Sequence, residues 1–257
     1  MHKQREVFEE PENRNVRIWR YQSYSKFESV LRNQALFFCR VDRLDDAFEG
    51  SYPEAYRPHF DKDWEDRGKA LNLPEPLILQ FRAYNRDFRR ALRRCVVVNC
   101  WHMNDCESEA MWKIYTERRK GVAIQSTFTR LGESFNNNKV DDIYIGKIKY
   151  IDYMTETFPL SNAFYPYAYK RRSFAYENEV RAAILKFPIN DKGQLDLNME
   201  IYQRGKFVSV DPNILIERVF ISPTADPWLE KKARSALRKY GLVKEVIQSD
   251  LTKDPLY

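Results

Sequence analysis

The sequence predicts an α+β fold built on a mixed, mainly antiparallel sheet with flanking helices. Segments with strand and helix patterns alternate irregularly, whereas a doubly wound parallel fold needs regular alternation. No glycine-rich phosphate loop follows a predicted strand, which counts against the dinucleotide fingerprint and the P-loop. With 257 residues and 43% hydrophobic residues, we expect one domain, 1–257, that buries a large core.

The first third of the chain moves from a charged stretch into strands. Residues 1–15 are polar, and we expect them to be disordered. Residues 16–22 and 35–39 have strand patterns, with a short apolar helical stripe between them. We predict that residues 51–95 form a helical excursion or insertion, which ends in a helix at 77–95.

The helix predicted at 77–95 is strongly amphipathic. At about 100° per residue its apolar side chains gather on one side and its arginines on the other. The basic side contains Arg82, Arg86, Arg89, Arg90, Arg93 and Arg94. Most such faces are simply solvated, but a dense row of guanidinium groups is also able to bind a nucleic-acid backbone.

Strands and helices continue to alternate to the C-terminus. The predicted strands include 96–101, 143–151 and 179–187, the last two separated by an aromatic, basic loop. Helices are predicted at 107–121, where Gly121 would end the helix, and at 226–241.

Charge and cysteine content narrow the environment and the partners. A net charge of +6 and a pI near 9.0 favour anionic partners such as phosphates, nucleotides or nucleic acid. The four cysteines show no secreted disulfide framework, and the polar N-terminus does not resemble a signal peptide. No segment approaches the roughly 20 apolar residues of a membrane span. We therefore expect a reduced, cytoplasmic protein without membrane contact.

The segment SFAYENEVRAAI, residues 173–184, is the strongest candidate site. A strand that begins at Glu179 places Glu179 and Arg181 on one face, opposite a core face made by Val180, Ala182 and Ile184. Glu177 extends the polar row if the chain is already extended there. A carboxylate beside a guanidinium stays ionised, which suits a bond to a sugar hydroxyl or stabilisation of an oxocarbenium-like centre. The alternative is an ordinary ion pair.

Two other segments contain candidate ligand-binding residues. The strand end at Trp101 and His102 is placed to deliver side chains into a cleft, although His102 is as readily a structural histidine. Its neighbours Cys100 and Cys106 do not complete a standard zinc pattern, so no metal site is predicted. The loop FYPYAYKRRSF contributes Lys170 and Arg171 among aromatic rings, a mixture that suits a phosphate-bearing ligand with a flat ring.

Several of these motifs, in the same order, resemble a bacterial family. The segments IWRYQSYSKFESVLRNQALFFCRVDRLDDAFEG, NCWHMNDCESEAMWKIY, IYIGKIKYID and YKRRSFAYENEVRA are similar to the family catalogued as domain of unknown function 2971. The resemblance runs from about residue 16 to the C-terminal helix. It implies a part in conflicts with phages or mobile elements.

A second resemblance is to the ADP-ribosyltransferase superfamily. Small members begin with a strand that ends in a His or Arg, matched by Arg20, and have a catalytic acid at the start of a late strand, matched by Glu179. Arginine-modifying members use a Glu-x-Glu pair, which Glu177 and Glu179 reproduce. The middle motif has only loose matches, at 126–127 on a strand and at Tyr115 on a helix.

This second resemblance implies NAD as a substrate and roles for particular residues. Arg20 would hold a phosphate or ribose, and Lys170 and Arg171 would add charge near the diphosphate. Glu179 would bond the ribose 2′-hydroxyl and stabilise the developing positive charge, while Glu177 would orient the acceptor. The remaining residues of the implied NAD site are Tyr21, Trp101, His102, Trp112, Tyr115 and Arg181, with a ring of Trp101, Trp112 or Tyr115 stacked on a base.

Our leading hypothesis is therefore an NAD-dependent ADP-ribosyltransferase-like enzyme of a bacterial phage-defence or toxin system, with a possible protein partner from the same operon. The first alternative is a nucleic-acid-binding or nuclease-like effector that uses the basic helix. Its acidic residues would be Asp45, Asp46 and Glu49, although no lysine follows at a telling spacing. The second alternative is a non-catalytic nucleotide sensor.

Overall fold

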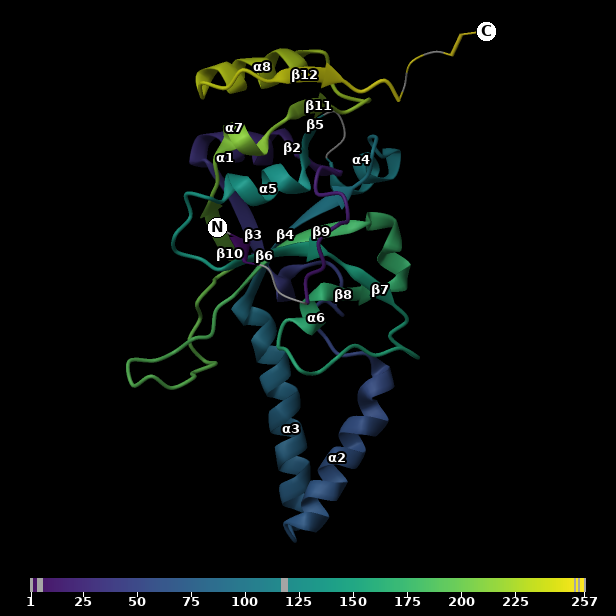
Figure 1. Ribbon diagram of the computed structural model, residues 1–257, viewed down its shortest axis with the longest axis vertical. Helices are drawn as coiled ribbons and strands as arrows, with labels where there is room; N and C mark the ends of the chain where they lie inside the picture. The colour runs from purple at the N-terminus through teal and green to yellow at the C-terminus, as the bar shows by residue number, and fades with distance from the viewer. Residues whose placement is uncertain (1, 4–6, 117–119, 252, 254, 257) are drawn as a thin grey trace.

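The computed structural model describes residues 2–3, 7–116, 120–251, 253 and 255–256, and it is organised around a ten-stranded sheet (Figure 1). The strand order is β1-β6-β9-β4-β2-β5-β11-β12, and β3 joins β4 to β10. These strands are β1 His2–Lys3, β2 Arg17–Ser23, β3 Ala35–Arg40, β4 Val96–Met103, β5 Gly121–Thr127, β6 Ile143–Lys147, β9 Glu179–Leu185, β10 Gly205–Ser209, β11 Arg218–Ile221 and β12 Glu245–Gln248. A second sheet pairs β7 (Lys149–Ile151) with β8 (Tyr169–Arg171).

Antiparallel pairing dominates the large sheet. The central strand β4 is antiparallel to β9, β2 and β3, and β5 is antiparallel to β2 and β11. Parallel pairing joins β1 to β6, β11 to β12 and β7 to β8. The predicted α+β class with a mixed, mainly antiparallel sheet is confirmed.

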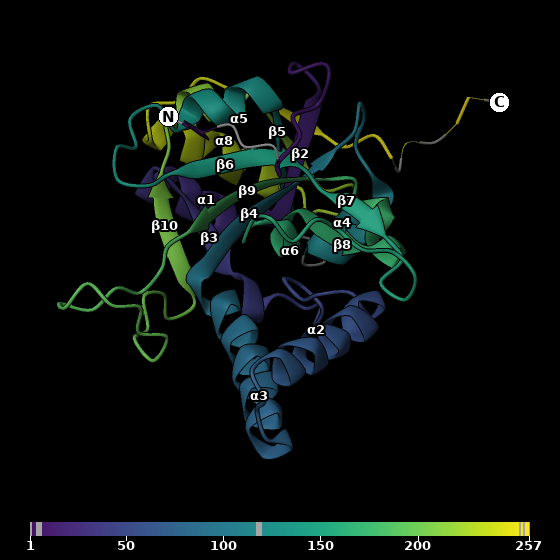
Figure 2. The same cartoon turned by 60° about the horizontal axis from the view of Figure 1, so that its bottom comes forward.

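Helices lie on both sides of the sheet. The α-helices are α1 Tyr24–Asn33, α2 Arg57–Ala70, α3 Glu75–Leu92, α4 Glu109–Tyr115, α5 Phe128–Ser134, α6 Tyr165–Ala168, α7 Pro212–Leu215 and α8 Trp228–Lys239, and the 3₁₀ turns are η1 Val41–Arg43, η2 Glu54–Tyr56, η3 Arg93–Cys95 and η4 Arg172–Glu177. Figures 1 and 2 show α1, α5 and α8 on one side and α2, α3 and α6 on the other. Within the described part of the chain, none of the helices combines the length and apolarity needed to cross a bilayer.

The central strands are buried on both faces. On one face Val97 and Trp101 of β4 pack with Val180 of β9 in a large cluster that includes side chains of α1, α5 and α8. On the other face Val96 and Val98 belong to a second cluster, built largely from tyrosine and phenylalanine rings of the 144–169 region. The predicted apolar face of β9 is therefore confirmed, and its polar face is buried as well.

One edge of β4 is shared by two strands, and this opens the sheet locally. β2 pairs only with the end of β4, at Trp19 opposite His102, whereas β3 pairs with its first half, at Cys39 opposite Val98. The main chain of Cys100 lies between these two pairings. β2 and β3 diverge there, and a side chain can enter the gap.

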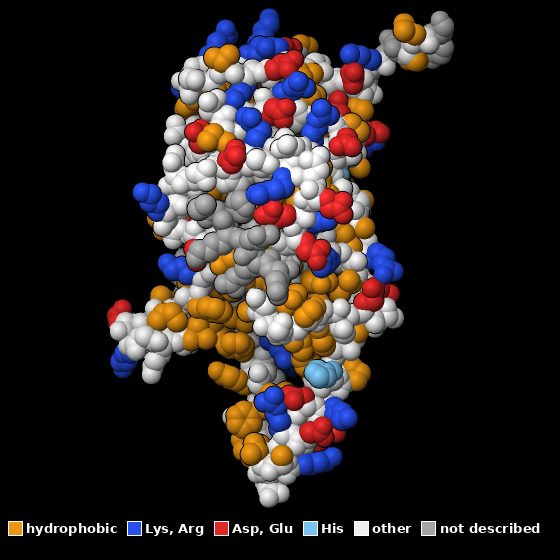
Figure 3. Space-filling model, in the orientation of Figure 1, with side chains coloured by type: hydrophobic (Ala, Val, Ile, Leu, Met, Phe, Trp, Pro, Cys, Tyr) orange, Lys and Arg blue, Asp and Glu red, His pale blue; other side chains and the backbone are white. Residues whose placement is uncertain are grey.

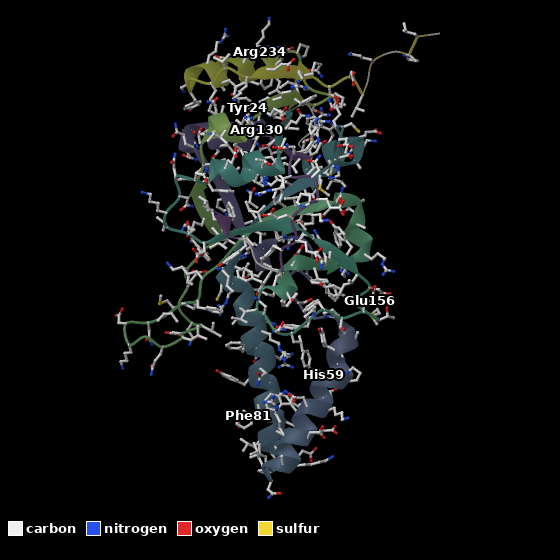
Figure 4. All side chains as sticks on the ribbon, viewed as in Figure 1. Tyr24, His59, Phe81, Arg130, Glu156 and Arg234 are labelled. Atoms are coloured by element: carbon white, nitrogen blue, oxygen red, sulfur yellow. The ribbon has the colours of Figure 1, made fainter. Side chains whose placement is uncertain are left out.

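The basic helix forms part of a projecting hairpin. α2 and α3 are the two arms of this hairpin and extend away from the sheet. Figure 4 labels His59 on α2 and Phe81 on α3. No residue of α3 is buried, and Tyr84 is 67% exposed. The expected apolar side therefore does not pack on the core: the ring of Phe81 stacks on that of Trp64, with centroids 6.1 Å apart. Figure 3 shows hydrophobic side chains gathered where the hairpin meets the sheet.

Three predicted boundaries differ from the structure. The strand expected over 143–151 breaks between β6 and β7, which belong to different sheets. Gly121 begins β5 instead of ending a helix, because its main chain pairs with Ser23 of β2. The helix expected over 107–121 is observed as α4, and its segment 117–119 lies outside the described residues.

The N-terminal stretch packs on β6. Val7 and Phe8, within the 1–15 stretch that was expected to be disordered, are 3% and 2% exposed and join the second cluster. The backbone N–H of Lys147 donates to the carbonyl of Glu9 at 2.8 Å. This close approach requires Gly146, because a Cβ there would lie 2.6 Å from the carbonyl carbon of Phe8.

We expect Gly146→Ala to lower the free energy of unfolding by about 1–3 kcal/mol, because the methyl group would push the N-terminal stretch off β6. A Gly→Ala change that meets no obstruction within a strand raises the free energy of unfolding by about 0.5–1 kcal/mol, so a decrease would indicate a clash. Urea unfolding of wild type and variant measures the difference. A stabilised or unchanged variant would contradict the observed packing of Phe8 against this strand.

Candidate active site

The start of β9 places two charged side chains in the interior. Glu179 and Arg181 lie on the same face of the strand, opposite His102 and Cys100 of β4. They are 3% and 0% exposed. The period of two in the sequence correctly predicts their shared face, but this face is not a solvated sheet surface.

Arg181 has an acceptor for each of its five N–H groups. Its Nε and Nη2 donate to the carboxylate of Glu179 at 2.6 and 3.0 Å, and its Nη1 and Nη2 donate to that of Glu49, both at 2.9 Å. Nη1 also donates to the carbonyl of Tyr167 at 3.0 Å. Since a guanidinium offers five donors, Arg181 has none left for a ligand.

Lys170 connects the acids to one another. Its Nζ lies 2.5 Å from a carboxylate oxygen of Glu177, 3.2 Å from one of Glu49 and 3.6 Å from one of Glu179. Together with Arg181, this group comprises three carboxylates and two cations, a formal charge of −1. We call these five residues the acid cluster.

The opposite charges in the acid cluster favour the ionised forms of Glu179 and Lys170. Burial alone would raise the pKa of Glu179, but the charges of Arg181 and Lys170 outweigh it and lower that pKa to about 2, with hydrogen bonds from Arg181 and the Cys100 thiol contributing. Burial would lower the pKa of Lys170, and the carboxylates, Glu179 first, raise it well above its ordinary value. Glu179 is therefore a carboxylate at neutral pH.

Two tyrosine hydroxyls contact the acid cluster, one at Glu177 and one at the backbone of Glu179. The phenol of Tyr115 donates to a Glu177 carboxylate oxygen at 2.7 Å, and Tyr115 is 44% exposed. Burial and the charge of Glu177 raise the pKa of Tyr115, so the phenol keeps its proton. Tyr150 accepts a hydrogen bond from the backbone N–H of Glu179 at 2.8 Å. Glu177 thus links the buried cluster to an exposed ring.

His102 is neutral and has a free acceptor. Its Nδ1 lies 2.6 Å from the carbonyl oxygen of Glu177, so Nδ1 has the proton and donates it there. Burial lowers the pKa of His102. Its Nε2 is buried and has no hydrogen-bond partner among the described residues. An acceptor left unpaired beside the acid cluster suits a hydroxyl or amide donor on a ligand.

Arg20 contacts the main chain of β4 in the gap between β2 and β3, on the face of the sheet opposite to His102. Its Nη1 donates to the carbonyl of Cys100 at 2.7 Å, and the Cys100 thiol contacts Glu179 on the other side. Burial lowers the pKa of Arg20. Among the described residues no carboxylate pairs with it, so this partly buried cation lacks an anionic partner.

Two of the three aromatic rings that were expected to stack on a base of NAD are buried in the protein. Trp101 is 2% exposed in the large cluster, on the opposite face of β4 from His102. Trp112 is 3% exposed and packs edge-on against Tyr21, with centroids 4.9 Å apart, and the Tyr21 hydroxyl accepts from the backbone N–H of Ser108. Of the three rings expected to stack on a base, Tyr115 is the exposed one.

The other candidates have partners within the protein. Arg171 donates to Asp46 at 2.6 Å and lies over the ring of Phe48. The hydroxyl of Ser126, in the loosely matched middle motif, is fully buried and donates to the carbonyl of Leu215 at 2.5 Å. These contacts are internal to the fold.

Sequence reasoning assigned no role in this site to Glu49 or Tyr150. The sequence places Glu49 in an acidic nuclease-like group with Asp45 and Asp46. In the structure it contacts Lys170 and Arg181, and Arg181 is 132 residues away in the chain. The one available signal was the acid-rich run before Gly50, whose φ of +68° marks a tight turn. Within the described residues, no group of three or more His, Cys, Asp or Glu side chains is placed to hold a metal ion.

The basic residues of α3 separate into two groups. Arg82 pairs with Asp61 of α2, and Arg89 lies 3.7 Å from the ring centroid of Phe60. Arg86 is exposed and lies 3.5 Å from Asp87. The continuous cationic stripe expected from the helical period is therefore interrupted, and Arg90 and Arg93 lie near the base of the helix.

No protein-family model and no curated protein matches the sequence, so the resemblance to the family catalogued as domain of unknown function 2971 stays a prediction. Among solved structures, similar chains include Thermus sp. 2.9 DarT in complex with NAD+ (6% identity, TM-score 0.39, 93% of this chain and 97% of that chain) and with ADP-ribosylated ssDNA (9%, 0.40, 94% and 96%). The complex with carba-NAD+ has 8% identity and a TM-score of 0.35 over 93% and 96%. Likenesses this low leave the functional assignment to the side chains of the present chain.

We expect Glu179→Gln to lower the free energy of unfolding by about 3 kcal/mol at neutral pH, the equivalent of a carboxyl pKa that falls from 4.5 to about 2 on folding. Because the folded pKa is the lower one, this contribution is present above pH 4.5 and is lost as the pH falls toward 2. Urea unfolding across this range should show the gap between wild type and variant closing. The exposed Glu109→Gln is the control, and a gap that stays constant with pH would contradict the assignment.

Proposed function

We propose that the chain is an NAD-dependent ADP-ribosyltransferase-like enzyme that works at the acid cluster. The observation that carries the proposal is the pair of carboxylates where η4 leads into β9: Glu177 ends the turn, Asn178 follows in a left-handed conformation, and Glu179 begins the strand. Glu179 is buried and ionised, and Glu177 joins it to the exposed Tyr115. A buried cluster with a formal charge of −1 favours a positively charged group beside it more strongly than the same charge in water would.

The transfer of ADP-ribose from NAD needs a negatively charged environment beside the ribose. When the bond between the ribose and nicotinamide breaks, nicotinamide leaves with the bonding electron pair and positive charge develops on the ribose ring. An acceptor nucleophile then forms the new bond to the same carbon and loses its proton. A carboxylate that is already ionised and fixed in place, as Glu179 is, stabilises this charge without reorganisation, so its effect is greater in the transition state than in the ground state.

The two acids have different surroundings and different proposed roles. Both oxygens of Glu179 contact Arg181, which fixes the carboxylate beside the reacting sugar. Glu177 has the Tyr115 phenol as an outer partner, and a ligand or acceptor hydroxyl is able to replace that phenol. We assign electrostatic stabilisation to Glu179 and orientation of a hydroxyl or acceptor to Glu177.

The residues around the cluster suit the remaining parts of NAD. His102 Nε2 provides an unpaired acceptor for a ribose hydroxyl or the carboxamide, and the exposed ring of Tyr115 provides a stacking surface. Arg20, without a carboxylate partner among the described residues, is the best candidate for the diphosphate. Lys170 and Arg171 already neutralise carboxylates, which makes them weaker candidates for that role than expected from the sequence.

The biological setting is proposed on the sequence resemblance. We propose that the enzyme belongs to a bacterial phage-defence or toxin system in the cytoplasm, where a protein partner from the same operon would control it. A non-catalytic nucleotide sensor would use the same residues. It differs in predicting that NAD raises the melting temperature without release of nicotinamide.

We expect wild-type protein incubated with NAD and a cell lysate to release nicotinamide, and Glu177→Gln to reduce the rate at least 100-fold, equivalent to about 2.7 kcal/mol of transition-state stabilisation. Chromatographic detection of nicotinamide measures the rate, and melting temperatures establish that the variant is folded. Glu109→Gln removes a carboxylate from the exposed side of α4 and serves as the matched control. Equal rates for wild type and Glu177→Gln, or no release by wild type, would reject the proposal.

We expect Arg20→Gln to raise the Kd for NAD about tenfold, or about 1.4 kcal/mol, because the partly buried guanidinium would lose a phosphate partner. Isothermal titration calorimetry measures the affinity. Arg17→Gln is the control, since Arg17 lies on the same strand and its Nη1 donates to the carbonyl of Asp105 at 2.9 Å in an exposed position. An unchanged Kd would contradict the assignment of Arg20 to the diphosphate and leave it the structural contact with the Cys100 carbonyl.

A further inference from the structure

A second group of cations lines a cavity at the base of α3. The cavity has a volume of about 380 Å³, within the range of small-molecule sites. It is lined by Asp42, Asp87, Arg90, Ala91, Arg93 and Arg94. These residues come from η1, the last turns of α3 and η3, directly before β4.

The two acids in the lining have other cationic partners. The carboxylate of Asp42 lies 2.7 Å from Nε of Arg40, a residue whose side chain is 4% exposed. The carboxylate of Asp87 lies 3.5 Å from Nε of Arg86. Neither acid forms an ion pair with an arginine of the lining, and three arginines against two acids give the lining a formal charge of +1.

The three arginines of the cavity lack anionic partners. No carboxylate among the described residues pairs with Arg90, Arg93 or Arg94, and the one hydrogen bond from their guanidinium groups joins Arg94 to the carbonyl of Leu197 at 2.9 Å. Nε of Arg93 is buried and has no acceptor in the described chain. A buried N–H without an acceptor costs about 1–3 kcal/mol, so a ligand that supplies the acceptor gains that free energy on binding.

We infer that this cavity binds a phosphate-bearing ligand of nucleotide size, either a free nucleotide or one nucleotide unit of a nucleic-acid strand. Guanidinium groups match the oxygens of phosphate in a bidentate geometry, and a phosphate supplies several acceptors at once. The site involves Arg90 and Arg93 but not Arg82 or Arg89, which contact α2.

The cavity is separate from the acid cluster. Arg93 precedes the first residue of β4, whereas His102 lies near the other end of that strand. Six residues of strand between Val96 and His102 span about 20 Å. A ligand here and one at the acid cluster would therefore occupy opposite ends of the same strand, and the inference does not depend on the proposed transferase activity.

Fluorescence anisotropy with a labelled single-stranded oligonucleotide at low salt tests the inference, with an unlabelled nucleoside monophosphate as competitor. We expect wild type to bind, and Arg90→Gln with Arg93→Gln to raise the Kd at least tenfold. For a strand, the loss of two phosphate contacts should also reduce the slope of log K against log salt by roughly 1.4. Arg57→Gln, which removes the same charge from an exposed position on α2, is the control.

The two sources of phosphate give different outcomes. Competition by the monophosphate at an affinity similar to that of the oligonucleotide identifies a free-nucleotide site, and much weaker competition identifies a strand site. Arg90 is exposed, so Arg90→Gln alone should leave the melting temperature unchanged and still weaken binding, which separates binding from folding. No binding by wild type, or equal binding by the double variant and Arg57→Gln, would overturn the inference.

Discussion

The buried guanidinium of Arg181 organises the interior of this protein. Its five N–H groups join three segments that are distant in sequence: the start of β9 through Glu179, the loop before Gly50 through Glu49, and α6 through the carbonyl of Tyr167. Loss of any of these acceptors would leave a buried charge with an unsatisfied donor, which is one of the most destabilising changes in a protein interior. The β9 strand, the loop and α6 therefore hold their positions together.

The same arrangement explains the charge of the acid cluster. Arg181 and Lys170 compensate two of the three carboxylates, which leaves a formal charge of −1, and Glu177 is the carboxylate that also contacts the exposed Tyr115. Burying so many charges costs desolvation free energy, and such clusters are often no more stabilising than packed hydrophobic residues. A buried charge cluster of this kind is therefore not by itself evidence of stability.

The sheet separates charges of opposite sign along β4. At one end are the acid cluster and neutral His102, and at the other are Arg93 and the cationic cavity beneath α3. The divergence of β2 and β3 beside Cys100 lets the Arg20 guanidinium reach the Cys100 carbonyl. The cations at the first end, Lys170 and Arg181, already have carboxylate partners, whereas no described carboxylate pairs with Arg93 at the other end.

The sequence alone determined the fold class, most of the strands and the orientation of side chains along β9. These features follow from local periodicity, since a period of two places Glu179 and Arg181 together whatever the surroundings. The periodicity of a strand does not show which other segments of the chain cover each of its two faces. It therefore could not show that this polar face is buried, that Trp101 lies in the core, or that α3 projects from the sheet with no buried residue.

Only the tertiary structure decided which charges meet. Glu49 and Arg181 are 132 residues apart, and no local pattern links a loop acid to a strand guanidinium. The same holds for Arg171 with Asp46, and for Arg93, which one helical face grouped with Arg82 but packing separated from it. Side-chain identity and spacing set what each residue is able to do, and the long-range packing of loops on strands set which partner it has.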